Sequence, residues 1–159
     1  MNIDIICIGK IKEVFYREAL NEYAKRLSKY CKFNIIELND EQTPDNAPEA
    51  VERKILDTEG KRILAKLSND AYVIATAIEG KKMGSESFAR LIDDLGINGH
   101  SRIVFVIGGS LGLSDEVKKR ADMLLSFSDM TFPHQLMRVI LAEQIYRSYR
   151  IINNQPYHK

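Results

Sequence analysis

The chain has 159 residues, of which 45% are hydrophobic and 28% are charged, and its formal net charge is +1. This length fits one domain with a sizeable core, and the composition excludes an intrinsically disordered chain. The near-neutral charge gives no global signal of nucleic-acid binding, and no apolar run approaches the roughly 18 residues of a membrane span.

The N-terminal run "MNIDIICIGK" begins directly as a strand. It lacks the basic region, the long apolar region and the cleavage site of a signal peptide, so we expect a cytoplasmic protein with no membrane partner. Cys7 and Cys31 do not have the spacing of a zinc site, and we expect no metal.

Charge is unevenly distributed along the chain. Residues 37–60 contain eight acidic and two basic residues, whereas residues 1–32 and 130–159 are net basic. A local basic face that binds a partner fits this distribution, and so does an ordinary solvated surface.

Strand and helix signals alternate from one end of the chain to the other. Apolar runs predict strands at residues 3–9, 33–38, 71–78, 102–109 and 123–127. Helical periodicity predicts helices at residues 13–30, 49–67, 85–95, 115–121 and 133–152. This alternation predicts an α/β protein of a single domain, with a mainly parallel sheet flanked by helices. Ligands bind such sheets beyond the carboxyl ends of the strands, which here means residues 76–80, 108–113 and 127–134.

Glycine and serine mark several expected element ends. Gly60 falls inside the second predicted helix and argues against one unbroken element. Gly80 and Gly84 are expected to end the third strand. Ser85 is the expected N-cap of the next helix, and Gly96 is its expected C′ residue.

A glycine-rich turn, "IGGSLGLS" (107–114), follows the strongest strand. Gly108, Gly109 and Gly112 allow a ligand to approach the backbone closely. Their spacing is neither G-x-G-x-x-G nor that of a P-loop, which disfavours a small doubly wound protein that binds a nucleotide through either motif. A ligand site and a plain tight turn both remain open.

The stretch "FSDMTF" (127–132) is an unusually apolar loop. Its large side chains, Phe127, Met130 and Phe132, require something to bury them. The protein core, a partner subunit and a flat ligand are three candidates.

The last predicted helix starts with a proline and a histidine. Pro133 suits its first position, and the helix dipole disfavours a charged His134, so a neutral imidazole can exchange a proton there. A purely structural histidine is the alternative. Arg138 lies on the same helix face, and together the two side chains can hold an anionic or carbonyl-bearing substrate. The helix is apolar on more than one side, which predicts a symmetric dimer. The terminal "PYHK" (156–159) either frays or folds over a site.

Three segments resemble one known family: "VFVIGGSLGL", "LSFSDMTFPHQLMRVILAEQIYRSYRI" and the terminal "PYHK". Together with the "ICIGK" start they look like the RlmH family of SPOUT-class RNA methyltransferases, over essentially the whole chain. The resemblance implies that residues 1–159 form a single SPOUT methyltransferase domain. Its part from about residue 100 to 155 is expected to be threaded into a trefoil knot, a rare exception among protein folds. The resemblance also implies a homodimer.

The same resemblance implies an activity. The methyl donor is S-adenosylmethionine, without a metal, and the acceptor is N3 of a pseudouridine in helix 69 of the 23S rRNA, within the assembled 70S ribosome. The implied donor-binding residues are Thr76, Gly108, Phe127, Ser128, Asp129, Met130, Thr131 and Phe132. Our hypothesis takes His134, Arg138 and His158 as the catalytic residues, with the proton handled by His134 or by His158 from the tail of the partner subunit. The same hypothesis assigns the positioning of the RNA to Arg138, Tyr157, His158 and Lys159.

One segment departs from the pattern of that family. Its members often have a leucine followed by an acidic residue where this chain has Thr76 and Ala77 in "IATAIEGK", while Gly80 and Lys81 match. If the acidic group orients the donor, the question is whether Glu79 replaces it. The departure also keeps an alternative open, in which the chain is a non-catalytic ribosome-binding or assembly factor with the same fold.

Overall fold

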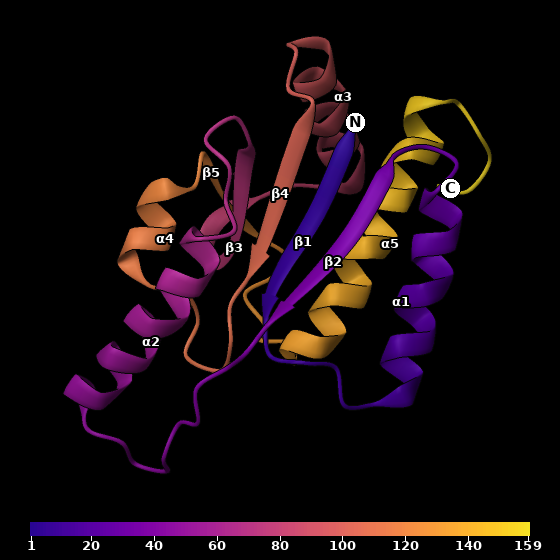
Figure 1. Ribbon diagram of the computed structural model, residues 1–159. Coiled ribbons are helices and arrows are strands. Elements are labelled where there is room, and N and C mark those ends of the chain that lie inside the picture. The colour runs from indigo at the N-terminus through magenta and orange to yellow at the C-terminus, as the bar shows by residue number, and fades with distance from the viewer.

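Five strands and five helices alternate along the chain, as the sequence predicts, and the computed structural model describes residues 1–159 (Figure 1). The strands are β1 (Asn2–Ile8), β2 (Lys32–Leu38), β3 (Tyr72–Lys82), β4 (Arg102–Ile107) and β5 (Met123–Ser126). The helices are α1 (Val14–Leu27), α2 (Glu49–Leu64), α3 (Ser85–Ile97), α4 (Asp115–Arg120) and α5 (His134–Ile152). None of these helices combines the length and the apolar character that crossing a membrane requires.

The strands form one sheet in the order β2-β1-β4-β3-β5, and every neighbouring pair is parallel. The predicted fold class, a single-domain parallel α/β sheet flanked by helices, is confirmed. Parallel pairing brings the carboxyl ends of all five strands to one edge of the sheet, so the loops that follow them lie together.

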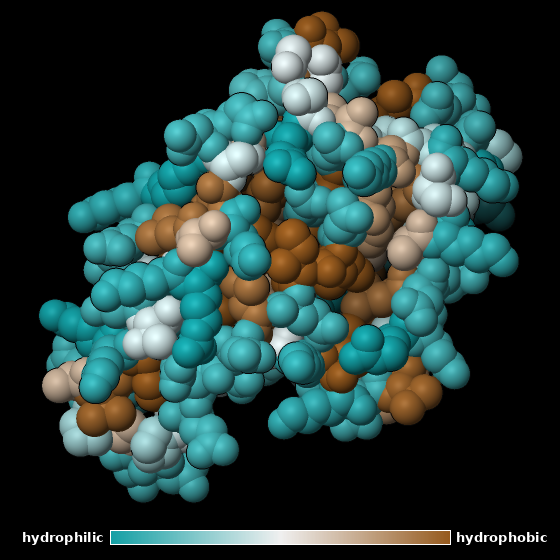
Figure 2. Space-filling view, viewed as in Figure 1, coloured by the Kyte–Doolittle hydropathy of each residue, from teal (hydrophilic) through white to brown (hydrophobic).

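Helices cover the sheet on both faces. Alternate residues of β1 point to opposite sides: Ile5 and Cys7 pack in a core with side chains of α3 and α5, whereas Ile6 and Ile8 pack with α2 and α4. Figure 1 shows α1, α3 and α5 behind the sheet and α2 and α4 in front of it at the left. In the same orientation, Figure 2 shows hydrophobic residues at the centre of the viewed face, where no helix lies in front of β1.

The helix predicted at residues 49–67 is confirmed as α2, although Gly60 lies inside it. The helix runs unbroken through Gly60, which is buried. A Cβ atom at this position would lie 2.3 Å from the Oγ of Ser114, so glycine is present because another segment packs directly on the helix. The sequence signal was real, but its cause is close packing and not a helix end.

The helix predicted at residues 85–95 is confirmed as α3, but neither predicted capping residue is correct. Gly84 occupies the N-cap position, and the Ser85 hydroxyl instead donates to Oε1 of Gln144 at 2.8 Å. The helix continues through Gly96, and Gly99, with φ of +88°, takes the left-handed position three residues later. The His100 N–H then donates to the Leu95 carbonyl at 3.0 Å, which satisfies one of the last helical acceptors.

Strand β3 runs to Lys82, beyond the predicted end near Ile78, and Gly80 does not end it. Thr76 and Lys81 both pair with Leu125 of β5, so residues 77–80 form an insert between two paired positions. A Cβ atom on Gly80 would lie 2.7 Å from the backbone of Leu125, because β5 passes directly against it. The insert is therefore fixed to the sheet on both sides, at the edge where a ligand is expected.

Candidate functional site

A cavity of about 320 Å³ opens at the carboxyl ends of β3, β4 and β5. This volume falls in the usual range of small-molecule sites, about 300–1,000 Å³. Its walls are the insert of β3, the glycine-rich turn after β4, and the loop between β5 and α5. The side chains and backbone that line it include Thr76, Ala77, Ile78, Glu79, Gly108, Gly109, Leu111, Gly112, Lys118, Phe127, Ser128, Met130, Thr131, Phe132, His134 and Met137.

All of the residues predicted to bind the methyl donor line this cavity, except Asp129. The Asp129 carboxylate instead pairs with the Lys82 ammonium group of β3. This ion pair links the β5–α5 loop to the far side of the β3 insert. Three loops that are distant in sequence are thus brought around one cavity.

The glycine-rich turn folds back on itself. Gly109 and Gly112 form a short antiparallel bridge, with the Gly112 N–H donating to the Gly109 carbonyl at 3.1 Å. A Cβ atom on Gly108 would lie 2.4 Å from the Gly112 carbonyl oxygen. Any other residue at position 108 would therefore open the turn. The tight turn that the sequence predicts is therefore present, and its backbone faces the cavity; the ligand site stays a prediction.

The apolar loop after β5 divides its large side chains between two environments. Phe127 and Phe132 pack against the main hydrophobic core, whereas Met130 is 75% exposed at the rim of the cavity. The Ser128 hydroxyl accepts the Met130 N–H at 3.0 Å and stabilises the turn between them. The core therefore partly buries two of the three side chains that the sequence left without a partner.

At the segment that departs from the family pattern, Thr76 bonds within the sheet and the acidic group at the cavity comes from Glu79. The Thr76 hydroxyl donates to the Val106 carbonyl at 3.1 Å, so it is used inside the sheet. Glu79 lines the cavity and accepts a hydrogen bond of 2.6 Å from the Lys118 ammonium group. That hydrogen bond lowers the pKa of the Glu79 carboxyl below its usual 4.5, so the group is ionised at neutral pH. Glu79 thus brings an acidic group to this wall of the cavity.

His134, the first residue of α5, lines the cavity and is half-buried. Burial lowers the pKa of its imidazole below the usual 6.5, the nearby Arg138 and Lys12 cations lower it further, and Asp40 opposes them. The neutral form therefore prevails near pH 7, as the sequence predicts. A neutral imidazole beside a ligand cavity can accept a proton.

Arg138 is fully buried and does not line the cavity. Its Nη2 donates to the carbonyl oxygens of Ile8 and Gly9, both at 2.9 Å. Its Nη1 donates to the Glu37 carboxylate at 3.2 Å, and the same carboxylate accepts the Ile11 N–H at 2.6 Å. Arg138 therefore connects α5 to the loop that follows β1, and in this arrangement it does not reach a substrate as the sequence suggested.

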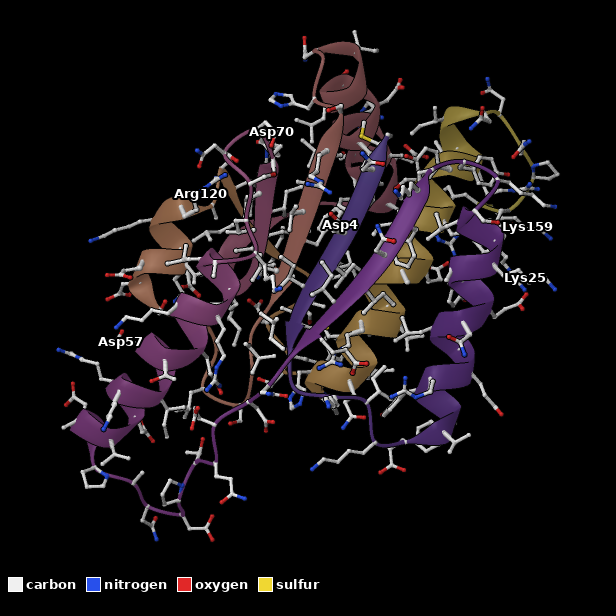
Figure 3. The ribbon with its side chains drawn as sticks, in the orientation of Figure 1. Asp4, Lys25, Asp57, Asp70, Arg120 and Lys159 are labelled. Carbon is white, nitrogen blue, oxygen red and sulfur yellow. The ribbon has the colours of Figure 1, made fainter.

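The C-terminal tail is folded onto its own protomer. The Tyr157 hydroxyl donates to Glu143 at 3.0 Å, the Arg147 guanidinium lies over the Tyr157 ring, and Arg147 lies 3.2 Å from the imidazole of His158. Figure 3 shows Lys159 beside the C-terminal half of α1, at the other end of the molecule from the carboxyl ends of the strands. Within one protomer, the tail and His134 are therefore not brought together.

Two acidic residues close to this edge escaped the sequence-based predictions. Glu37 lies in the half-buried run of β2, and Glu59 lies in α2 between Ile55 and Ile63. Both positions have the spacing of inward-facing residues, and an acidic residue at such a position is the sequence signal that could have marked them as candidates. The role of Lys118 had no such signal, because only the fold places it opposite Glu79.

Comparison with known proteins agrees with this geometry. A family model described as "Predicted SPOUT methyltransferase" matches residues 1–158. Among similar proteins named "Ribosomal RNA large subunit methyltransferase H", one from Clostridium novyi is 61% identical, and two from Clostridium perfringens and Clostridioides difficile are each 57% identical. Each alignment covers 100% of this chain and 100% of the relative. The chain therefore belongs to the SPOUT methyltransferase family, and within it to the RlmH group that its motifs resemble.

Proposed function

We propose that this protein transfers a methyl group from S-adenosylmethionine to N3 of a pseudouridine in helix 69 of the 23S rRNA, acting on the assembled ribosome as a homodimer. The observation that carries the proposal is the cavity at the carboxyl ends of three strands, in a chain of this family. Its relatives' names, which specify ribosomal RNA of the large subunit, support the class of substrate.

The cavity suits such a donor. When bound, S-adenosylmethionine supplies an electrophilic methyl group on a positively charged sulfur. The turn at Gly108 offers backbone groups, Leu111 and Phe132 offer apolar surface, and the ionised Glu79 carboxylate has the charge that complements a sulfonium. The protein's main task is to hold donor and acceptor in line at about 3 Å, in near-attack geometry.

The acceptor nitrogen carries a proton that must leave during transfer. We assign His134 as the group that accepts it, because its imidazole lines the cavity and its lowered pKa favours the neutral form. The Lys12 cation lowers the pKa of His134, and we assign to its ammonium group the stabilisation of negative charge on the acceptor. Arg138 contributes by fixing the loop from Gly9 to Ile11 beside His134.

The homodimer and the trefoil knot of about residues 100–155 belong to the same proposal. Leu136, Val139 and Ile140 of α5 remain only half-buried in the protomer, which leaves apolar surface for a second copy. Because each tail lies away from its own cavity, we assign RNA contacts of Tyr157, His158 and Lys159 to the cavity of the partner subunit.

The decisive experiment is mass spectrometry of 23S rRNA from cells with and without the gene. We expect the N3-methylated pseudouridine to be lost without the gene and restored by the wild-type copy, but not by the variant His134→Ala. A mark that persists without the gene contradicts the proposal. Calorimetry with S-adenosylmethionine separates an enzyme from a non-catalytic ribosome-binding factor, because only the former needs to bind the donor.

A further inference from the structure

Glu59 is a buried carboxyl group that the proposed reaction does not use. The residue is 4% exposed, in the middle of a mostly solvated helix. Its Oε1 accepts the backbone N–H of Glu41 at 3.1 Å, whereas its Oε2 has no hydrogen-bond partner. A buried carboxyl with one unpaired oxygen destabilises the fold, so its presence calls for a functional explanation.

Glu59 lies against the turn that forms one wall of the cavity. A Cβ atom added to Gly109 would lie 3.3 Å from the Glu59 Oε2 and 3.1 Å from Ile8. A Cβ atom on the next residue of the helix, Gly60, would lie 2.3 Å from the Oγ of Ser114, at the other end of the turn. Residues 59–60 of α2 thus support both ends of the segment from Gly109 to Ser114, and the inner side of that segment faces the cavity.

The other side of Glu59 is occupied by the acidic segment after β2. Arg62, one helical turn away, donates to the Asn39 carbonyl at 2.9 Å and pairs with the Glu41 carboxylate. Further along this segment, the hydroxyl groups of Thr43 and Ser110 lie 3.5 Å apart. Residues 39–43 therefore cross over Glu59 and meet the outer side of the turn.

We propose that Glu59 is a positioning residue of the donor site, whose carboxyl group holds the segment 39–41 and the turn at Gly109 in their relative places. This inference rests on the proposed donor site. Because a Gly109 backbone that shifts outward changes the cavity wall, loss of Glu59 weakens donor binding without removing any group that touches the donor.

Ionisation of Glu59 acts on the Gly109 side of the carboxyl group, because the Glu41 N–H favours the charged form whereas the unpaired Oε2 does not. Burial raises the pKa of the Glu59 carboxyl above its usual 4.5, the Asp40 and Glu41 carboxylates raise it further, and the Glu41 N–H and the Arg62 cation oppose them. Relative to the unfolded chain, the folded state thus shifts Glu59 towards its protonated form, and the stability that this form contributes is lost as pH rises through the raised pKa. A charged Oε2 against Gly109 draws in water, which loosens the turn, so donor affinity falls over the same interval of pH.

The test is calorimetry of S-adenosylmethionine binding to the full-length protein, from pH 4.5 to pH 8. Glu59→Leu should bind about tenfold more weakly than wild type, a change of about 1.4 kcal/mol. Glu59→Gln keeps the shape and the bond to Glu41, so it should bind within about threefold of wild type, with an affinity that no longer falls with pH through the Glu59 titration. The matched control is Glu49→Leu on the same helix, whose side chain is 89% exposed and which should bind like wild type.

Two outcomes overturn the inference. One is wild-type affinity in a folded Glu59→Leu variant. The other, which decides the matter if Glu59→Leu does not fold, is a pH dependence of donor affinity that is the same in Glu59→Gln as in wild type. Absence of donor binding by the wild-type protein is a different result, and it refutes the proposed function itself.

Discussion

Replacement of Arg138 by methionine distinguishes a buried positioning residue from a residue that contacts substrate. Methionine has a similar length but no donors. The change leaves the carbonyl oxygens of Ile8 and Gly9 without the two hydrogen bonds of 2.9 Å that the guanidinium gives them. It also leaves the Glu37 carboxylate without a partner that lies 3.2 Å away.

The magnitude follows from the burial of these groups. A buried acceptor without a donor costs about 1–3 kcal/mol, and two carbonyls are affected. Glu37 is 23% exposed, so solvent screens its charge and its share is smaller. We expect the free energy of unfolding to fall by about 3–5 kcal/mol, the usual effect of removing one partner of a buried pair. For a chain of this length this corresponds to a melting temperature lower by about 6–20 °C.

Urea denaturation followed by circular dichroism measures the change, with methylation of ribosomes assayed well below the melting temperature. Arg138→Lys should lose less stability, because an ammonium group keeps some of these bonds. Arg53→Met, at an exposed ion pair in α2, is the control and should leave stability unchanged. A loss of stability below about 1 kcal/mol together with abolished methylation refutes the reasoning, because that result belongs to a direct substrate contact.

Three further predictions concern the cavity. In single-turnover assays the methylation rate should rise with pH to a plateau, with its midpoint below the usual 6.5 of histidine, because the pKa of His134 is lowered and only its neutral form accepts a proton. The rise with pH should vanish in His134→Gln, and an unchanged rise in that variant assigns it to another group. Glu79→Gln should weaken S-adenosylmethionine binding about fivefold in calorimetry, because a negative charge beside the sulfonium is lost; equal affinity contradicts that role. Gly80→Ala should lower both the melting temperature and donor affinity, since its Cβ would lie 2.7 Å from the backbone of Leu125; unchanged values of both would mean that the insert adapts.

The order of elements and the parallel sheet were predictable because they depend on local periodicity. The run from Ile3 to Gly9 and the run from Arg102 to Gly109 are apolar at almost every position, which is typical of strands buried on both faces. The element ends were less predictable. Gly96 and Ser85 have the residue types of helix ends, but the residues that end the helix are Gly84 and Gly99, two further glycines nearby.

The site was predictable where it depends on loop position and not where it depends on long-range contacts. The apolar loop and the glycine-rich turn follow strands, and the fold brings both to the cavity. The burial of Arg138 could not be read from its helix face, because its partners, Ile8 and Glu37, lie more than one hundred residues earlier in the chain. Arg138 lies four residues after His134, as a shared helix face requires, but His134 lines the cavity whereas Arg138 bonds the backbone of Ile8 and the Glu37 carboxylate.

The insert of β3 has a consequence for how fast a ligand enters. Residues 77–80 are closed off by two pairings to the same residue, Leu125, so this wall is already ordered before any ligand arrives. In the opposite wall, Phe127 and Phe132 pack on the core at the two ends of the loop, whereas its tip at Met130 is exposed and the adjacent Asp129 is held by a solvent-exposed ion pair with Lys82. Donor association should therefore depend more on the tip of this loop than on the β3 insert. Raising the ionic strength, which weakens that pair, should speed release of the donor more than it slows capture.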